Sequence, residues 1–182
     1  MIRSDQEDIL NIIIDQNTLQ NKITEMAKII SNDYQDKNLL LVCVMNGSVF
    51  FSVDLIKQLT VKADLDFITV ASYHKTESSG EIKFYRDIST DVSDKDVLII
   101  EDILDSGRTF SFLLEHFKKK NPKSLKSCSL LDKPDRRVVE VNLDYTGFTI
   151  ADVFIVGYGM DYEQRYRQLP FIGELKPQVY SG

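Results

Sequence analysis

Apolar residues recur along this chain at spacings that predict helices and buried strands. The stretch from Asn17 to about Tyr34 has helical periodicity, with Asn17 as the candidate N-cap. Further helices are predicted after Gly47 and after Thr109. The apolar faces of these helices would be formed by Leu19, Ile23, Met26 and Ile30, by Val49, Val53 and Ile56, and by Phe110, Leu113, Leu114 and Phe117.

Short apolar runs elsewhere are typical of strands that are covered on both faces. These runs span residues 39–44, 65–71, 97–100, 127–131 and 153–156. Strands that alternate with helices predict an α/β fold, with a mostly parallel central sheet, flanking helices and right-handed crossovers, in a single domain over residues 1–182. The small polar residues at 72–80 predict a loop, and residues 82–87 predict either an antiparallel strand or an arm of that loop.

The overall charge narrows the possible partners. The chain carries 28 Asp and Glu against 22 Lys and Arg, a net charge of −6, although residues 118–137 are strongly basic. This balance argues against a nucleic-acid partner, because general nucleic-acid binding rests on many cation–phosphate contacts. Cys43 and Cys128 each lie in an apolar run and are expected to be buried free thiols. Without a visible signal core or membrane-length apolar run, we expect a soluble, cytoplasmic protein with no membrane partner.

The residues that follow the run at 97–100 carry the most distinctive chemistry, at the strand end where parallel sheets bind ligands. Asp105 to Thr109 form a hydroxyl-rich turn with one glycine that opens a helix, and such a turn can hold a phosphate on backbone amides. The adjacent carboxylates Glu101 and Asp102 would repel each other by roughly 4 kcal/mol at ~4 Å, at an effective dielectric near ~20. Magnesium or ligand hydroxyls would relieve that repulsion. The alternative is that Asp105 caps the helix beside two solvated carboxylates.

Residues 97–109 resemble the phosphoribosyl-diphosphate fingerprint of the type I phosphoribosyltransferases: four apolar residues, two acidic residues and an Asp-Ser-Gly-x-Thr turn. Segments 130–134, 154–162 and 165–167 resemble hypoxanthine-guanine phosphoribosyltransferases in order and spacing. The resemblance covers nearly the whole chain and implies that family's fold, with a small hood formed by the chain ends. It implies a purine-salvage transferase that moves the 5-phosphoribosyl group of phosphoribosyl diphosphate to N9 of hypoxanthine, and of guanine, giving IMP or GMP and pyrophosphate.

The resemblance also implies roles for individual residues. The turn would bind the 5-phosphate through Asp105, Ser106, Gly107, Arg108 and Thr109. Asp105 would also be the general base that accepts a proton from purine N7, which requires a carboxylate more basic than usual or a short hydrogen bond. Glu101 and Asp102 would engage the ribose hydroxyls, directly or through Mg²⁺, and Asp161 would ligate the Mg²⁺ that carries the pyrophosphate.

The remaining implied roles concern the base, the pyrophosphate and closure of the site. Lys133 would donate to the purine O6, Phe154 would stack on the base, and the Ile155 backbone would contact the Watson–Crick edge of the base, with Asp161 nearby. Asn46 and Gly47, preceded by a cis peptide bond, would bind pyrophosphate together with Arg167. Many relatives carry Lys or Arg where Asn46 stands, so a side-chain cation is missing there. Ser72 and Tyr73 resemble the start of a flexible closing loop, and the family implies a homodimer or homotetramer.

Two alternatives stay open at this point. Another base, adenine or xanthine, could be the substrate, although a cationic donor such as Lys133 favours an oxo group over the amine of adenine. A regulator with the same fold that binds RNA would carry a similar turn, but it would have no reason to keep Lys133, Phe154 and Asp161 together. His74 and His116 carry no catalytic signal and are expected to be solvated.

Overall fold

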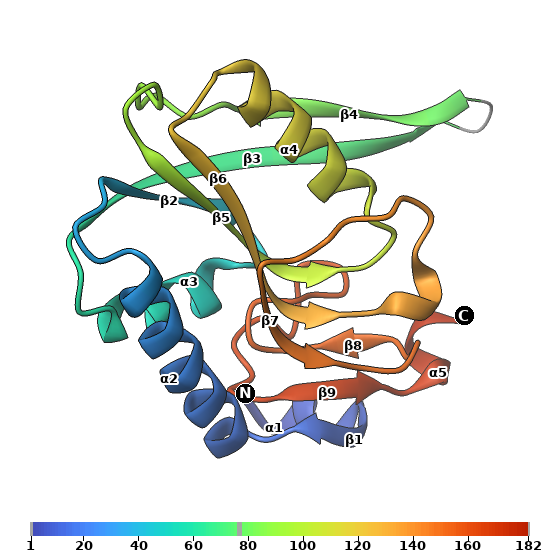
Figure 1. Ribbon diagram of the computed structural model, residues 1–182. Helices are drawn as coiled ribbons and strands as arrows, with labels where there is room; N and C mark the ends of the chain where they lie inside the picture. Colours follow the sequence, from blue (N-terminus) through green and yellow to red (C-terminus); the bar gives the residue numbers. More distant parts are fainter. Residues whose placement is uncertain (1, 76–77, 182) are drawn as a thin grey trace.

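The computed structural model describes residues 2–75 and 78–181, which form two sheets and the helices around them (Figure 1). The larger sheet has six strands in the order β4-β3-β2-β5-β6-β7, and the smaller has three in the order β1-β9-β8. The strands are β1 (Ile9–Ile14), β2 (Leu39–Met45), β3 (Ala63–Lys75), β4 (Ser78–Arg86), β5 (Asp96–Leu104), β6 (Ser124–Asp132), β7 (Tyr145–Thr149), β8 (Ile155–Val156) and β9 (Ile172–Leu175). The helices are α1 (Ile2–Glu7), α2 (Gln16–Asp33), α3 (Val49–Gln58), α4 (Arg108–Lys119) and α5 (Pro177–Tyr180), with a 3-10 turn at Pro134–Arg136.

The larger sheet confirms the predicted α/β architecture. Strands β3, β2, β5, β6 and β7 run parallel to one another, and β4 pairs antiparallel with β3 at the edge. Alternate residues of β2 face opposite sides: Leu41 packs in one apolar cluster with α2 and α3, and Val42 in another with α4. Because both faces are covered, β2 has no polar alternation. Cys43 and Cys128 are buried free thiols, as predicted.

Helix α2 buries the face that the sequence predicts, and helix α3 does not. Leu19, Ile23, Met26 and Ile30 are all buried in α2. The cap is Asp15 rather than Asn17, because the Asp15 carboxylate accepts hydrogen bonds from the amides of Asn17 and Thr18. In α3, Phe51 and Leu55 face the core while Val53 is 43% exposed. This helix is apolar on several sides, so periodicity alone does not select the buried face.

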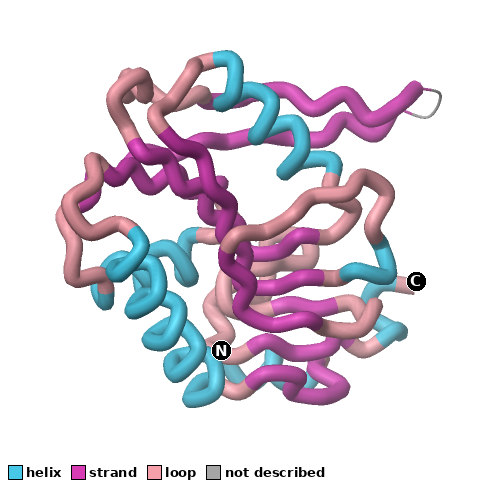
Figure 2. Tube along the Cα trace, viewed as in Figure 1, coloured by secondary structure: helices cyan, strands magenta, loops and turns pink. Residues whose placement is uncertain are grey.

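Residues 72–75 and 78–80 do not form the predicted loop; residues 76–77 of that prediction lie outside the described part of the chain. β3 continues to Lys75 and β4 begins at Ser78, and the two strands pair antiparallel in a long ribbon that extends beyond the rest of the sheet (Figures 1 and 2). Residues 82–86 therefore belong to an antiparallel strand, one of the two structures predicted for 82–87. The predicted closing residues Ser72 and Tyr73 lie on β3, opposite Ile82 and Glu81.

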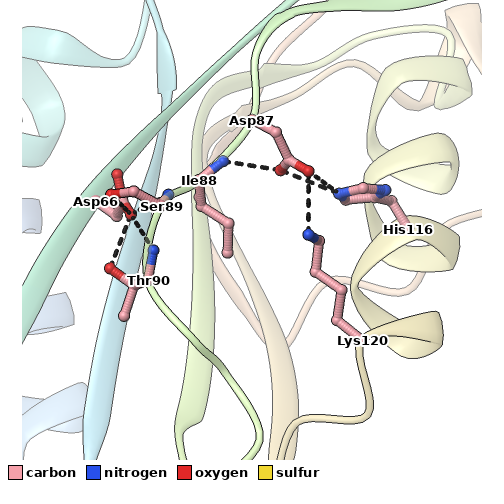
Figure 3. Close-up of polar contacts among 7 residues, drawn as sticks. All are labelled: Asp66, Asp87, Ile88, Ser89, Thr90, His116 and Lys120. Atoms are coloured by element: carbon pink, nitrogen blue, oxygen red, sulfur yellow. Dashed lines mark hydrogen bonds and ion pairs between the residues drawn. The ribbon is translucent and has the colours of Figure 1, made fainter.

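Two carboxylates, one buried and one half-buried, fix the base of this ribbon (Figure 3). Asp66 on β3 accepts hydrogen bonds from the amides and hydroxyls of Ser89 and Thr90, in the segment that follows β4. Asp87 contacts His116 Nε2 at 3.0 Å and Lys120 Nζ at 3.0 Å, which ties the end of β4 to α4. His116 also packs against the ring of Phe84 with centroids 4.3 Å apart, so it is a structural contact rather than the solvated side chain expected.

The smaller sheet is built by the two ends of the chain and matches the predicted hood (Figure 1). β1 pairs antiparallel with β9, and β9 pairs antiparallel with β8. The run at 153–156 was expected in the central sheet, but only Ile155–Val156 form a strand, and it lies in the hood. The outer strand of the parallel sheet is β7, which the sequence did not predict. No helix within residues 2–75 and 78–181 is long and apolar enough to cross a membrane.

Candidate active site

A cavity of about 560 Å³ lies where the carboxyl ends of β2, β5 and β6 meet the hood. Its position follows the rule that parallel sheets bind ligands beyond the carboxyl ends of their strands. Nine of the residues singled out from the sequence line it: Asn46, Gly47, Asp102, Asp105, Lys133, Phe154, Ile155, Asp161 and Arg167. Residues far apart along the chain are thus brought to one place.

Two neighbouring carboxylates at the end of β5 are largely enclosed by protein. Burial raises the pKa of Asp102 to about 6. Burial, and the charge of Asp102 beside it, raise the pKa of Glu101 well above its ordinary value. Glu101 Oε2 accepts no hydrogen bond within the part of the chain that the structure describes. The negative charge at this strand end is therefore poorly compensated by the protein's own side chains, and the two carboxylates are not the solvated pair of the alternative interpretation.

The turn that follows β5 is fixed by its carbonyl groups. The Ser106 carbonyl accepts from the amides of Val138 and Val139, and Arg137 Nη1 donates to the Asp105 carbonyl at 2.6 Å. Gly107, at φ +83°, is the N-cap of α4, and a Cβ there would lie 2.0 Å from the Val139 carbonyl oxygen. Asp105 is thus not the cap, and Gly107 has no side chain to cap the helix; the Ser106 hydroxyl accepts only a long hydrogen bond, 3.5 Å, from the Arg108 amide. The N-terminal end of α4 is therefore only weakly capped, and its amides can face an anion.

The predicted pyrophosphate loop contacts this strand end directly. The peptide bond between Met45 and Asn46 is cis, as expected. A Cβ on Gly47 would lie 1.9 Å from Oδ2 of Asp102, so only glycine allows the loop backbone to approach that carboxylate so closely. Asn46 and Gly47 both line the cavity, where their backbone can contact a ligand.

A buried cation lies at the end of β6. Lys133 is 5% exposed, and its Nζ donates to the Val153 carbonyl at 2.5 Å. Burial lowers the pKa of Lys133, while the nearby carboxylates of Asp105 and Asp152 oppose that effect. A lysine ammonium has three donors, so donors beyond the one directed at Val153 are available to a ligand in the cavity.

A second cation, Arg136, joins carboxylates on two sides of the same cavity. Its Nε lies 3.2 Å from Oδ1 of Asp105, and its Nη1 lies 3.7 Å from Oδ1 of Asp152. Asp152 Oδ1 is also 3.8 Å from Lys133 Nζ. Arg136 and Asp152 were not predicted as site residues, because nothing in their local sequence distinguishes them from solvated charges.

The aromatic wall of the cavity is formed by Phe154. Its ring stacks on Tyr180 with centroids 4.6 Å apart and an interplanar angle of 19°, and meets Tyr162 edge to face at 5.6 Å. Tyr180 also lines the cavity, together with Ile103 and Met160. None of these three was predicted as a site residue, because apolar and aromatic residues are mostly core.

The diphosphate side of the cavity has an arginine that is already paired. Arg167 Nη2 lies 2.8 Å from Oδ1 of Asp161, and Arg167 Nη1 donates to the Gly159 carbonyl at 2.7 Å. Asp161 Oδ2 accepts from the amide of Gln164 at 2.9 Å. These contacts hold both side chains at the wall of the cavity, with opposite charges side by side.

Some predicted residues lie outside the cavity wall. Ser106, Gly107, Arg108 and Thr109 lie in the adjoining turn and at the start of α4, and Glu101 precedes Asp102 on β5. Ser72 and Tyr73 are on the protruding ribbon, and the side chain of His74 is outside the described part of the structure.

The carboxylates fit a divalent cation that is shared with a ligand. Within residues 2–75 and 78–181, no group of three His, Cys, Asp or Glu side chains is close enough to hold a metal alone, so Glu101, Asp102 and Asp161 do not form a closed cage. Magnesium typically binds one or two carboxylates together with substrate phosphates and water. The unpaired oxygen of Glu101 and the raised pKa of Asp102 suit such a shared site.

Comparison with known proteins agrees with this geometry. Residues 12–163 match the family model of the phosphoribosyl transferase domain. The chain is 44% identical over 178 residues to a hypoxanthine-guanine phosphoribosyltransferase of Bacillus subtilis, covering 97% of this chain and 99% of that protein. It is 46% identical over 175 residues to a bifunctional protein TilS/HprT of Listeria monocytogenes, covering 96% of this chain but only 27% of that protein. A solved hypoxanthine phosphoribosyltransferase of Staphylococcus aureus superposes with a TM-score of 0.94 at 41% identity, covering 98% of both chains.

Proposed function

The chain belongs to the phosphoribosyltransferase family, and we propose that it transfers a 5-phosphoribosyl group from phosphoribosyl diphosphate to N9 of hypoxanthine, and of guanine, in purine salvage. The observation that carries this proposal is the meeting of Lys133 and Phe154 with Asp105 in one cavity. A buried ammonium and an aromatic ring suit an oxopurine, and the neighbouring turn suits a phosphate. The single-domain organisation over 1–182 stays a prediction, as do a cytoplasmic location and a homodimer or homotetramer.

In this proposal the two substrates use different walls of the cavity. The 5-phosphate would bind the amides at the start of α4, at the turn of Asp105 to Thr109. The diphosphate would lie against Asn46, Gly47 and Arg167. Asp102, Asp161 and Glu101 would hold the magnesium ion, which supplies positive charge to the diphosphate when bound.

The base would lie between the carboxyl end of β6 and the hood. Lys133 would donate to the purine O6, which favours hypoxanthine or guanine over adenine, and Phe154 would stack on the ring. The backbone of Ile155 would contact the Watson–Crick edge. Asp105 would accept the N7 proton as the N9 bond forms, so the purine N7–H would compete with Arg136 for that carboxylate.

The β3–β4 ribbon would limit hydrolysis of the activated ribose. Ser72 and Tyr73 lie on it, and closure over the cavity would exclude water from the developing cation. The contacts of Asp66 and Asp87 hold the base of the ribbon in place (Figure 3).

An assay of four bases tests the proposal. The purified chain would be incubated with phosphoribosyl diphosphate, MgCl₂ and hypoxanthine, guanine, xanthine or adenine, and the nucleotide product measured by absorbance and chromatography. We expect formation of IMP, and of GMP. Turnover of adenine alone would overturn the proposal. The RNA-binding regulator predicts no turnover of any base together with salt-dependent RNA binding, but it gives no reason for Lys133, Phe154 and Asp161 to share one cavity.

A further inference from the structure

The base-stacking residue Phe154 is itself held by the carboxyl-terminal segment. Its ring stacks on Tyr180 at 4.6 Å and 19°, and both side chains line the cavity. Two rings at this separation are in direct contact, so no third ring fits between them. A base that stacks on Phe154 must therefore use the opposite face of that ring. Tyr180 would then support Phe154 from the face that the base does not contact.

Phe154 needs such support because no regular structure orients it. It precedes β8, which begins at Ile155, and lies outside every strand. The Phe154 carbonyl accepts from the Leu175 amide at 2.8 Å, so the backbone is tied to the end of β9. Its ring is restrained by Tyr180 on one side and by the perpendicular ring of Tyr162.

Tyr180 is in turn fixed by contacts at the start of its short helix. Pro177 occupies the first turn of α5, where its missing amide is not needed. The Lys176 amide donates to the Asp8 carbonyl at 2.9 Å, and the Val179 amide donates to the Lys176 carbonyl at 2.9 Å. The end of the chain is thereby joined to its beginning, and the hood sets the position of the Tyr180 ring.

We propose that Tyr180 is a positioning residue for the purine base, which acts by holding the ring of Phe154 in the plane that the base stacks upon. This inference rests on the proposed function and goes beyond it, because it makes the carboxyl-terminal segment part of the base subsite. It concerns the base alone: Tyr180 stacks on Phe154, whereas the diphosphate would lie against Asn46, Gly47 and Arg167.

Steady-state kinetics of Tyr180→Ala, Tyr180→Phe and a control variant separate this role from a general structural one. An aromatic pair contributes enough beyond simple burial to change an equilibrium by roughly 2- to 12-fold. We expect Tyr180→Ala to raise the KM for hypoxanthine by about that factor and to leave the KM for phosphoribosyl diphosphate unchanged. Tyr180→Phe keeps the ring and should restore the wild-type KM. Gln178→Ala, at an exposed position of the same helix, should change neither KM.

The results that overturn the inference are equally definite. An unchanged or lowered KM for hypoxanthine in Tyr180→Ala would show that the ring does not support the base. Equal increases in both KM values would show that the hood has simply been disturbed. A wild-type chain that turns over no oxopurine would instead contradict the proposed function, so the two failures are distinguishable.

A spectroscopic variant gives a second, independent readout. The chain contains no tryptophan, so Tyr180→Trp introduces a single indole at this stack. We expect IMP to change the fluorescence of Tyr180→Trp in a saturable way, because the base would stack on the partner ring. Ile29→Trp, at a position of α2 that is 46% exposed, is the control and should not respond. A Tyr180→Trp signal that IMP leaves unchanged would contradict the inference.

Discussion

Replacement of Lys133 tests most directly why the cavity would prefer an oxopurine to adenine. The replacement Lys133→Met keeps most of the apolar stem and removes the ammonium. In the structure that ammonium is buried, donates to the Val153 carbonyl at 2.5 Å and lies 3.8 Å from Asp152. Because the cation is already desolvated and held in place, little further ordering is needed before it can donate to a purine O6.

The size of the effect follows from this geometry. A hydrogen bond from a charged group is worth roughly 1.5–3 kcal/mol, which corresponds to a loss of about 10- to 150-fold in kcat/KM for hypoxanthine. Adenine has an amine at the same position and gains nothing from the ammonium, so its kcat/KM should change much less. The ratio of the two kcat/KM values should therefore fall by about the same factor.

The assay is a pair of steady-state titrations, with hypoxanthine and adenine at saturating phosphoribosyl diphosphate. Lys126→Met is the matched control: Lys126 lies on the same strand β6, outside the cavity wall, where it pairs with Asp33 at 3.1 Å. Lys126→Met should keep the wild-type ratio. If Lys133→Met retained the wild-type preference for hypoxanthine, the assignment of Lys133 to the O6 of the base would be wrong.

Three further replacements test other parts of the structure. Asp105→Ala should lower kcat by at least ~10², the low end for loss of a general base, and a near-normal rate would remove that role while leaving the phosphate turn intact. Gly47→Ala should raise the KM for phosphoribosyl diphosphate at least about tenfold, because its Cβ would lie 1.9 Å from Asp102 Oδ2, and an unchanged KM would show that the loop can shift freely. Burial opposes ionisation of Asp66, but hydrogen bonds from Thr90, Phe67 and Ser89 outweigh it and hold its pKa at about 2, against an ordinary 3.8. Asp66→Asn should therefore lose roughly 2 kcal/mol of unfolding free energy at pH 7 in urea titrations. Since the folded pKa is the lower one, the wild-type advantage should persist down to about pH 4 and shrink below it. Asp64→Asn, on the same strand but 62% exposed, should lose under about 1 kcal/mol, and equal losses in both variants would contradict the argument.

The central sheet was predictable because a strand that is buried on both faces has an almost entirely apolar sequence. Residues Leu39 to Val44 are all buried, so the strand appears as an unbroken apolar run. The strands of the hood have no such apolar run that would identify them. β8 has two residues, and β1 exposes Leu10, Ile12 and Ile13, so neither shows the pattern of a covered strand. Pairing between the two ends of the chain depends on the completed fold.

The candidate site divides in the same way. Residues such as Asp105 and Lys133 follow strands directly, so the strand-end rule locates them from the sequence alone. Arg136, Asp152 and Tyr180 carry no local signal, because their contribution comes from side chains that are distant in sequence or oriented by the fold. The long ribbon was missed because its small polar residues at 72–80 have loop composition, although β3 and β4 pair through most of that stretch.

The charges of the cavity explain how a chain with a net charge of −6 could bind a polyanionic substrate. Arg167 is paired with Asp161, and Arg136 with Asp105 and Asp152. At these two arginines, binding would therefore exchange one set of ion pairs for another rather than neutralise free cations. Each exchange contributes only the difference in free energy between the new ion pair and the old one. The affinity for the substrate therefore depends on whether the displaced carboxylates find new partners. In the proposed reaction Asp161 would bind a magnesium ion, and Asp105 would accept the N7 proton of the base. Both carboxylates would then gain new partners as Arg167 and Arg136 are released.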